Sequence, residues 1–398
     1  MQIPIHSTAN TDFSTELVET GPLDPAIQRA WEGFLAISKS PEKVFQTPEY
    51  FAFISQNPVK SSSQELVVAR NAHNQEIVAV LPLRTGRRSL PLNIGNFTFL
   101  YLHLRTVALL GSVPMGAASP EMLDALIDFI FKSFPSKNTI AMQSLPKDSD
   151  FYQYLRNSKS IRKKYGFFVK DGWRDCHTTP LPDSFETYLS HFKAKKRYNL
   201  NRQLKLLEKN SGPLELVRID KPEHVPELVA AMKKLVSAQM LKSFLNENQF
   251  TDLARKKIKL GYILKCSGIP CAVIIGIQSK GTYHIHNILY DQDKAEYSPG
   301  TSILHLAIED MIDNLKISLI DYGYGSPEHS HQSSNVHKLR GHVILYKKTW
   351  ANRLMFSTYA AHSLLVDGAK SLLARVHPSS RLRQLKTPLP ALISFTFL

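Results

Sequence analysis

The sequence predicts an α/β (α+β) protein with two domains, each a mixed, largely antiparallel sheet flanked by helices. With 398 residues, of which 43% are hydrophobic, the chain is long enough for two well-buried cores. Strand-like and helix-like segments alternate in both halves. Their order in the first half (hairpin, third strand, Gly/Pro/Ser loop, helix, buried strand) recurs in the second half without residue-level similarity. We therefore place two domains, at 1–165 and 166–398.

Short apolar stretches are predicted to build the sheet of the first half. Residues 65–70 and 77–84 are typical of two strands joined by a polar turn, which together form a hairpin. The later elements are two further apolar stretches, a loop with its helix, and a buried-type strand, at 97–102, 106–112, 113–134 and 138–145. A basic, weakly patterned stretch at 157–170 marks the expected junction between the domains.

A long helical segment, 181–212, opens the second half. Within it Asp183 and Glu186 have capping-box spacing, and Gly212 stands where a helix would end. A strand and two helices follow, then three consecutive strands separated by short turns. After them come a loop with its helix, a strand and a last strand. In order, these segments lie at 214–219, 222–240, 250–260, 261–267, 271–279, 282–290, 297–310, 317–323 and 342–350.

Composition limits the class of protein. The net charge of +15 makes polyanions, anionic cofactors and membrane surfaces candidate partners, although a generally basic enzyme carries the same charge. The three cysteines form no CxxC pair, which argues against a disulfide framework or a thiolate zinc site and fits a reducing cytoplasm. The N-terminus lacks the features of a signal peptide, and no apolar run reaches the length of a membrane span. We expect a soluble, cytoplasmic protein.

One loop in the second half leads directly into a helix. In YSPGTSILHL, 297–306, turn-forming residues precede apolar residues at helical spacing. Taken alone, this is an ordinary helix start. Its place after three antiparallel strands favours an anion site, because a helix N-terminus offers free N–H groups and a partial positive charge. The residues of this candidate cofactor site are Ser298, Pro299, Gly300, Thr301 and Ser302.

Four segments of the second half carry a family resemblance. They are an Arg-rich helix, the SPG-then-helix step, an Asp-aromatic-Gly-x-Gly strand end and a later lysine, at 195–217, 290–310, 320–325 and 337–350. In this order they resemble the GNAT acyltransferases. More narrowly, they resemble the cellulose-biosynthesis-type GNAT acetyltransferases, relatives of the Fem aminoacyl transferases of peptidoglycan assembly. FQTPEYFAF and VAVLPLR in the first half resemble the degenerate N-terminal domain of that family.

This resemblance implies an acyl-CoA-dependent N-acyltransferase with tandem GNAT domains, with acetyl-CoA as the expected donor. Such an enzyme moves an acyl group from coenzyme A to an amine, and the family implies a bacterial setting in glycan or cell-envelope biosynthesis. The acceptor would be a small-molecule amine such as an amino sugar or a lipid precursor, and peripheral membrane association is a further expectation. The 298–302 loop would hold the coenzyme A pyrophosphate, and no metal is expected.

The resemblance also places the reaction centre between the strands before and after that helix, which separate in the GNAT fold. His284 and His286 are two residues apart on the first of these strands, so both imidazoles share one face. Asp321 lies near the end of the second strand. Because amine attack on a thioester needs a deprotonated amine, we expect Asp321 first, and then His286, to act as the base. Tyr290 is the candidate acid for the leaving thiolate.

A basic helix is the candidate substrate-binding element. Residues 193–209 carry seven cations around a stripe of leucines, which on its own is a solvated basic face. The family resemblance places Arg197 and Arg202 near the cleft between the domains, where they would bind an anionic substrate or cofactor. Lys338 matches the family's later lysine. That lysine usually follows the Gly-x-Gly closely, whereas here a longer loop and His337 intervene.

Other functions compete with this prediction. A Fem-like transferase that uses aminoacyl-tRNA would suit the basic charge, and tRNA is the nucleic acid expected in that case. However, 222–260 shows no heptads for the coiled-coil arm of most such proteins. A non-catalytic module for anionic glycan or nucleic acid would use the basic helix but not Asp321. Five histidines could supply metal ligands, namely His284, His286, His329, His331 and His337, but three of them lie in a polar loop with no carboxylate at ligand spacing. A Ser/His/Asp hydrolase lacks a G-x-S-x-G elbow.

Overall fold

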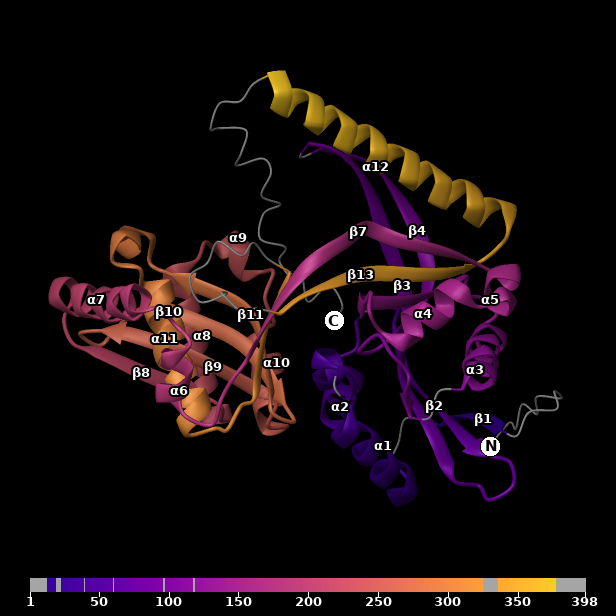
Figure 1. Ribbon diagram of the computed structural model, residues 1–398, viewed down its shortest axis with the longest axis horizontal. Coiled ribbons are helices and arrows are strands. Elements are labelled where there is room, and N and C mark those ends of the chain that lie inside the picture. The colour runs from indigo at the N-terminus through magenta and orange to yellow at the C-terminus, as the bar shows by residue number, and fades with distance from the viewer. Residues whose placement is uncertain are drawn as a thin grey trace. The chain divides into compact units, whose positions relative to one another are not determined.

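The computed structural model describes residues 13–18, 23–38, 40–59, 61–95, 97–116, 119–324 and 336–376. Within these ranges the chain forms two compact units (Figure 1). Unit 1 contains the residues up to Arg174 and those from Leu339 onward, and unit 2 contains Asp175–Lys338. This division differs from the expected domains at the C-terminal end, because the last strand pairs with a strand of unit 1.

Unit 1 is built on a sheet with the strand order β1-β2-β3-β4-β6-β13-β7, to which β5 adds beside β3. β4 and β6 are parallel, whereas β1/β2, β2/β3, β3/β4 and β6/β13 are antiparallel. Its elements are β1 (Phe13–Val18), α1 (Pro25–Ile37), η1 (Pro41–Gln46), α2 (Pro48–Gln56), β2 (Ser63–Asn71), β3 (Ile77–Ile94), β4 (Phe97–Leu109), β5 (Met115–Gly116), α3 (Pro120–Ser133), β6 (Thr139–Pro146), α4 (Asp150–Asn157), α5 (Lys159–Lys164), the first part of β7 (Tyr165–Pro180), most of β13 (Val336–Lys347) and α12 (Trp350–Val376).

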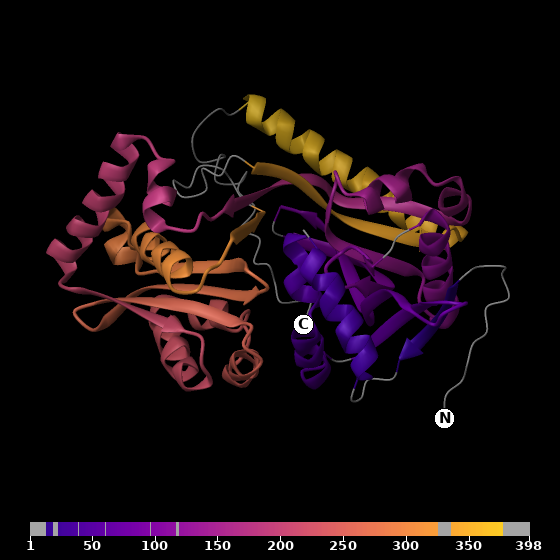
Figure 2. The ribbon, with the colours of Figure 1, turned by 60° about the horizontal axis from the view of Figure 1, so that its bottom comes forward.

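Unit 2 is built on a second run of strands, β7-β12-β11-β10-β9-β8, in which β11 and β12 are parallel and the other pairs antiparallel. Helices cover both faces of this sheet (Figure 2). Its own elements are α6 (Phe185–Ser190), α7 (Ala194–Ser211), β8 (Leu214–Ile219), η2 (Pro222–His224), α8 (Val225–Leu235), α9 (Ala238–Leu241), α10 (Glu247–Arg255), β9 (Lys259–Cys266), β10 (Ile269–Ser279), β11 (Thr282–Tyr290), η3 (Gln292–Tyr297), α11 (Pro299–Asp313) and β12 (Leu319–Tyr324).

The predicted fold class is therefore confirmed: mixed sheet, mostly antiparallel, with flanking helices. The expected hairpin is β2/β3, but β3 continues to Ile94, and the two apolar stretches after it form the single strand β4. The long helix expected at 181–212 is divided into α6 and α7. The stretch expected as a junction, 157–170, forms α5 and the beginning of β7. Among the described residues, no helix combines the length and apolarity needed to span a bilayer.

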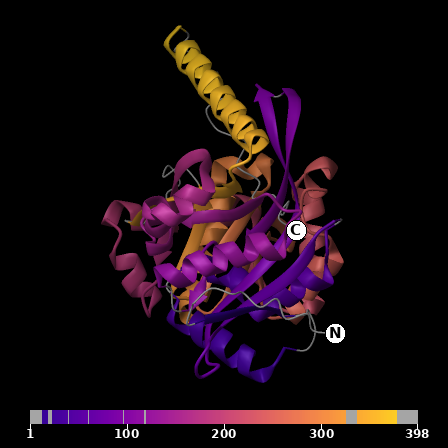
Figure 3. The ribbon, with the colours of Figure 1, turned by 90° about the vertical axis from the view of Figure 1, so that its right-hand side faces the viewer.

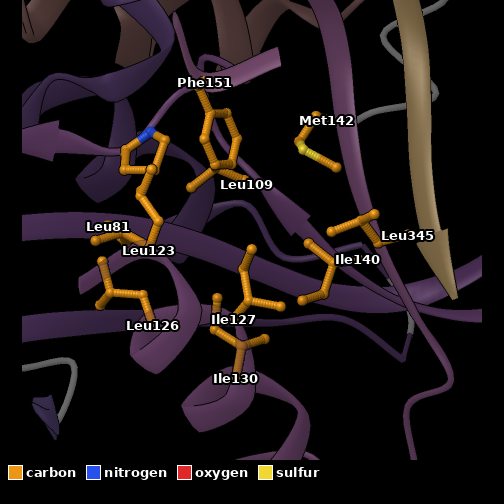
Figure 4. A pocket seen from close by; sticks show the side chains of 11 residues that line it. Leu81, Leu109, Leu123, Leu126, Ile127, Ile130, Ile140, Met142, Phe151 and Leu345 are labelled. Carbon is orange, nitrogen blue, oxygen red and sulfur yellow. The ribbon is translucent and has the colours of Figure 1, made fainter. Parts of the chain in front are cut away.

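Each unit has its own hydrophobic core. In unit 1, α3 packs on the sheet through side chains such as Leu126 and Ile130. A small cavity within this core is lined by apolar side chains of α3 and the neighbouring strands (Figure 4). In unit 2, Ile303, Ala307 and Ile308 of α11 pack on β9, β10 and β11. Because the lining of the unit 1 cavity offers no polar group, we interpret it as imperfect core packing.

Candidate active site

The parallel strands β11 and β12 of unit 2 pair over a short length and then separate. Their pairs are Thr282 with Leu319, Tyr283 with Ile320, and His284 with Asp321. Beyond the last pair, β11 stays bonded to β10 as far as Tyr290, and β12 stays bonded to β7 as far as Tyr324. The facing edges past His284 and Asp321 are therefore not paired with each other in the described structure. We call this opening the fork; its edge N–H and C=O groups are suited to an extended ligand.

Both strands of the fork carry a β-bulge where they part. On β11, Asn287 pairs with Ile275 and Ile285 pairs with Gly276, so His286 is the extra residue. On β12, Tyr322 is the extra residue opposite β7 in the same way. Bulges bend strands and redirect side chains, and they are common beside active sites. The bulge on β11 requires glycine at position 276, since a Cβ there would lie 2.4 Å from the His284 carbonyl oxygen.

Asp321 and His284 form a buried pair at the base of the fork. The exposed fraction of Asp321 is 1% and that of His284 is 6%. Asp321 Oδ1 accepts a hydrogen bond of 2.7 Å from the Gly323 N–H, and Asp321 Oδ2 lies 3.6 Å from His284 Nδ1. The backbone and the imidazole thus fix the orientation of the carboxylate. Burial of a carboxylate is costly unless it has such partners, which makes this arrangement typical of a functional site.

His286 lies beside this pair as a neutral imidazole. Burial, together with the nearby His284 and Lys259, lowers the pKa of His286 to about 3, while Asp321 raises it. At neutral pH the ring therefore carries no charge. As a proton acceptor it is weak, but it can still offer a hydrogen bond to a ligand in the fork. The structure thus brings Asp321 and His286 together, as the sequence analysis expected, and gives them different electrostatic surroundings.

Lys259 is a member of this cluster that the sequence analysis missed. Its side chain is buried, its Nζ donates a hydrogen bond of 3.1 Å to the Gly276 carbonyl oxygen, and it lies 4.9 Å from the centre of the Phe250 ring. Burial lowers the pKa of Lys259 to about 7. Lys259 follows two other lysines, so it looked like part of a solvated run. The available signal was its place in the apolar run from Ile258 to Leu264, all of which is buried.

The predicted anion site is the start of α11. Ser298 has φ 57° and ψ 50°, a left-handed conformation that is unfavourable for serine, and its side chain does not cap the helix. The amides of Thr301 and Ser302 donate to the Ser298 carbonyl oxygen, and the Ser302 hydroxyl also donates to it at 3.2 Å. Pro299 has no N–H. Gly300 is therefore the residue whose amide and lack of side chain leave room for a ligand in this first turn.

Tyr290 lies at this helix start and not with the buried acid-base cluster. A Cβ on Gly300 would approach Tyr290 Cδ1 to 3.1 Å, so the tyrosine ring forms the wall opposite Gly300. Tyr290 follows His286 by four residues along β11, which corresponds to about 13 Å of extended strand. The three predicted catalytic residues are thus divided between two places: Asp321 and His286 at the fork, and Tyr290 at the far end of β11.

The basic helix α7 lies beside the start of α11. Gln203 Nε2 donates a hydrogen bond of 3.4 Å to Ser298 Oγ. Leu200 and Leu207 are the buried residues of the helix, while Arg197 and Arg202 are exposed. The guanidinium of Arg197 also donates to the Phe192 carbonyl oxygen at 2.8 Å. The candidate cations are therefore at the surface of the element that adjoins the anion site.

Lys338 is exposed in β13, directly after the 325–335 segment, and that segment lies outside the described residues together with His329 and His331. Within the residues that the structure describes, no group of three or more His, Cys, Asp or Glu side chains is placed to hold a metal ion.

Comparison with known proteins agrees with this geometry. A family model described as an acetyltransferase (GNAT) domain matches residues 194–331. Among solved structures, FemX is similar with a TM-score of 0.54 at 10% identity, over 83% of this chain and 97% of that chain. A tandem GNAT protein from the clavulanic acid biosynthesis pathway gives a TM-score of 0.49 at 12% identity, over 84% of this chain and 98% of that one.

Another similar structure is L-PGS from Bacillus licheniformis, with a TM-score of 0.45 at 13% identity, over 81% of this chain and 98% of that chain. No curated protein sequence matches. The matched domain supports an acyltransferase. Residues 194–331 thus match the GNAT domain that the sequence predicted for the second half, and the fold of the chain is similar to that of FemX.

Proposed function

We propose that this chain transfers an acyl group from coenzyme A to an amine, and that the fork is its active site. The observation that carries the proposal is the buried Asp321–His284 pair, which stands where the edges of β11 and β12 become free. A proton acceptor at an open strand edge is what acyl transfer to an amine requires. We propose acetyl-CoA as the donor, because the matched family model describes an acetyltransferase domain.

The residues present fit coenzyme A at both ends of β11. The Gly300 amide, the α11 dipole and the exposed cations of α7 suit its pyrophosphate. The free edge of β11 between His286 and Tyr290 suits the amide groups of its extended arm. When bound, the cofactor supplies an activated acyl carbon. Tyr290 then forms the wall beside the arm, a role that its contact with Gly300 favours over protonation of the leaving thiol.

Asp321 is the base in this proposal. An acceptor amine must lose a proton before it attacks an acyl carbon, and the Asp321 carboxylate is held in one orientation for that purpose by the Gly323 amide. His284 lies beside Asp321 Oδ2 and can stabilise the charge on the carboxylate. His286, neutral at physiological pH, is placed to orient the acceptor or the acyl oxygen by hydrogen bonding.

Further details of the biology are also proposals. We propose a small amine acceptor, such as an amino sugar or a lipid precursor, in glycan or cell-envelope biosynthesis. We place the protein in the cytoplasm, a location supported by its three buried cysteines, which form no disulfide. Arg202, next to the Gln203 that contacts Ser298, is the cation best placed to bind a cofactor phosphate.

A second candidate donor is aminoacyl-tRNA, which the exposed cationic face of α7 favours. The exposed side chains of this helix include Lys195, Arg197, Arg202, Lys205 and Lys209. Such a face would bind a phosphate backbone as well as a cofactor phosphate. The two candidates differ in the thiol, since only acyl transfer from coenzyme A releases one.

Calorimetry with acetyl-CoA, followed by a thiol-release assay with a panel of amino sugars and lipid amines, tests the proposal. We expect saturable acetyl-CoA binding and amine-dependent thiol release, both retained in the control variant Asp220→Asn on the surface of the same unit. Absence of acetyl-CoA binding would reject the coenzyme A assignment. If tRNA then bound tightly and with strong salt dependence, the second candidate would replace it.

A further inference from the structure

The sheet of unit 1 has one face that points away from α3. On β3, Leu81 and Leu83 pack in the core beneath α3, so the alternate residues Arg84 and Arg88 lie on the opposite face. The register places Gln64 of β2 directly across from Arg84, and residues opposed in this way share a face. Polar and basic side chains therefore stand on a part of the sheet that α3 does not cover.

The strands β13 and β7 add basic residues to the same face. Val343 of β13 and Trp173 of β7 pack in the core beneath α3, which leaves the adjacent His342 and Arg174 on the other side. Arg174 Nη2 lies 3.1 Å from His342 Nε2. Burial and three nearby cations, Arg88 among them, lower the pKa of His342 to about 3. The basic residues of β3, β7 and β13 thus lie close enough to act on one another.

Helices border this face on two sides. Phe356 and Tyr359 of α12 pack with Leu90 of β3. Figure 3 shows α12 and the β3/β4 pair extending in the same general direction from the rest of unit 1. At the other end, Tyr50 of α2 lies within electrostatic reach of Arg84. We call the surface between α2 and α12 the basic face; it consists of Tyr50, Gln64, Arg84, Arg88, Arg174 and His342.

Three hydrogen-bond donors at one end of the basic face have no acceptor in the described part of the chain. The half-buried guanidinium of Arg84 has no hydrogen bond or ion pair there. Gln64 is 8% exposed, and its Nε2 is buried without a hydrogen-bond partner. Burial raises the pKa of Tyr50 to about 12, so its hydroxyl stays protonated and can donate. Buried donors without an acceptor are rare in folded proteins, so this group points to a ligand that accepts hydrogen bonds.

Two acids border the basic face, and each has another partner. Glu42 Oε1 lies 3.0 Å from Nη1 of the buried Arg340. Asp171 Oδ1 accepts a hydrogen bond of 2.9 Å from the Tyr359 hydroxyl, and Asp171 Oδ2 lies 3.6 Å from Lys170 Nζ. Neither carboxylate is therefore the counter-charge of Arg84.

Arg84 and Arg88 lie near each other in spite of their like charge. Burial and the charge of Arg84 lower the pKa of Arg88 to about 9. A ligand with more than one negative charge would stabilise both guanidinium groups. A phosphoryl group carries up to two charges and offers three acceptor oxygens, and arginine binds it through two parallel hydrogen bonds. A carboxylate offers one charge and two oxygens, so the basic face fits a phosphoryl group better.

We propose that the basic face binds the phosphoryl or diphosphate group of a small molecule, with Tyr50, Gln64 and Arg84 as donors at one end and Arg88 and Arg174 at the other. This site belongs to unit 1 and lies on the face opposite α3. It is therefore separate from the helix start in unit 2 that is proposed for coenzyme A. The proposal is independent of the acyl-transfer proposal.

Calorimetry of the full chain with inorganic pyrophosphate tests the proposal. We expect saturable binding that weakens by at least about ten-fold in Arg84→Gln and by about three-fold in Gln64→Leu, since these variants lose a charged and a neutral hydrogen bond. Arg87→Gln is the matched control and should keep the affinity, because Arg87 is exposed and lies on the other face of the same strand, across from Arg105. In Gly300→Glu, which disfavours anions at the helix start of unit 2, binding should persist.

Thermal unfolding is the second readout and shows that each variant is folded. Pyrophosphate should raise the midpoint more in the unaltered chain and in Arg87→Gln than in Arg84→Gln, because a ligand stabilises the folded state in proportion to its occupancy. Absence of binding to the unaltered chain, or equal affinity in Arg84→Gln and Arg87→Gln, would overturn the proposal. Binding that is lost in Gly300→Glu alone would assign the anion to unit 2 and would also overturn it.

Two further probes distinguish the sources of the diphosphate. Uridine diphosphate carries it on a nucleoside, and farnesyl diphosphate carries it on a prenyl chain. Whichever binds more tightly identifies the class of ligand, provided that Arg84→Gln weakens this binding and Arg87→Gln does not. Binding of both compounds that Arg84→Gln leaves unchanged would contradict the proposal.

Discussion

The two units contain the same local arrangement, a strand, a helix and a parallel return strand, and treat it differently. In unit 1, β4 pairs with β6 from Thr106 to Leu109, and Leu109 is the last residue of β4. In unit 2, β11 pairs with β12 only as far as His284 and then continues to Tyr290. The fork therefore exists because β11 continues beyond its last pair with β12. The shared topology of the two units does not by itself create such an opening.

Side chains differ at the same places. Around the end of β4, unit 1 has the apolar cavity of Figure 4, bordered by Leu109, Ile140 and Met142. At the fork, unit 2 has Asp321 and His284. The comparison shows that the same strand-helix-strand arrangement can either pack into a hydrophobic core or hold a polar site. A few buried polar residues decide which of the two it does.

The helix starts that follow these strands differ in the same sense. Both begin with Ser-Pro, but the Ser119 side chain caps α3 by accepting the Met122 N–H, and Glu121 follows in the first turn. At α11 the serine does not cap and Gly300 follows. A capped, acidic first turn disfavours an anion, whereas an open one favours it. We therefore expect cofactor binding in unit 2 and not in unit 1.

The largest expected effect is that of Asp321→Asn. The amide keeps the shape of the side chain but cannot act as a base, so we expect the rate of acyl transfer to fall by about 10²- to 10⁴-fold with little change in acetyl-CoA affinity. Steady-state thiol release and calorimetry measure the two quantities. The control variant in unit 1, Thr139→Ala, should leave the rate unchanged, since Thr139 lies on the parallel return strand of unit 1, where it pairs with Thr106. Unchanged turnover in Asp321→Asn would show that another group is the base.

Next in size is the effect of Glu42→Gln on the stability of unit 1. Arg340 is fully buried and its Nη1 lies 3.0 Å from Glu42 Oε1. Removing the carboxylate leaves a buried guanidinium without its counter-charge, so we expect a loss of about 3 kcal/mol in the free energy of unfolding. Urea denaturation measures it. A loss below about 1 kcal/mol would mean that water reaches the guanidinium.

Lys259→Met tests the corresponding buried cation of unit 2, which hydrogen bonds to a carbonyl group and not to a carboxylate. Burial lowers the pKa of Lys259 from its unfolded value near 10.5 to about 7. When the pH is below about 7, the buried amine of Lys259 is charged in the folded protein, and this charge lowers the free energy of unfolding by its full amount. As pH rises from about 7 toward 10.5, the unfolded chain binds more protons than the folded one, so the stability of the unaltered protein rises.

We therefore expect Lys259→Met to stabilise the protein more at pH about 6 than at pH about 9, by an amount on the order of a few kcal/mol. Urea denaturation at the two pH values gives the difference. Lys256→Met, at a partly buried lysine that pairs with Asp252, is the control and should show no such dependence. The same pH dependence in both variants would show that Lys259 is solvated.

The smallest expected effect is that of Gly300→Glu, which gives α11 the acidic first turn of α3. The new carboxylate would repel phosphate and its Cβ would press on the Tyr290 ring, so acetyl-CoA affinity should fall by at least about ten-fold. Calorimetry measures the affinity. Gly300→Ala, which adds only the Cβ, separates the steric part from the electrostatic part. Equal affinity in all three proteins would place the anion site elsewhere.

Local patterns made the fold class and most elements predictable. Apolar stretches separated by short turns marked β9, β10 and β11, and the SPG step marked the start of α11. The prediction divided β4 and ended β3 too early because Pro91 and polar residues interrupt the pattern, while cross-strand pairing and α12 hold the two strands together. The pairing of β13 with β6 was not predictable, because no local signal identifies a strand's distant partner.

The position of the candidate site was predictable, but which residues lie together in it was not. Asp321 and His286 followed from the order of strands, whereas Tyr290 was grouped with them although the length of β11 separates it from the fork. Lys259 reaches the cluster through the pairing of β9 with β10, and its lowered pKa is a product of burial, which single residues do not reveal.

The place of β13 has a consequence for how the chain reaches its native state. Its partner β6 is synthesised about 200 residues earlier, and all of unit 2 emerges between them. During translation, the edge of β6 must wait without its neighbour while unit 2 can already form its own core. Unit 2 is in effect an insertion within unit 1, so unit 1 is completed only after the whole of that insertion has been made.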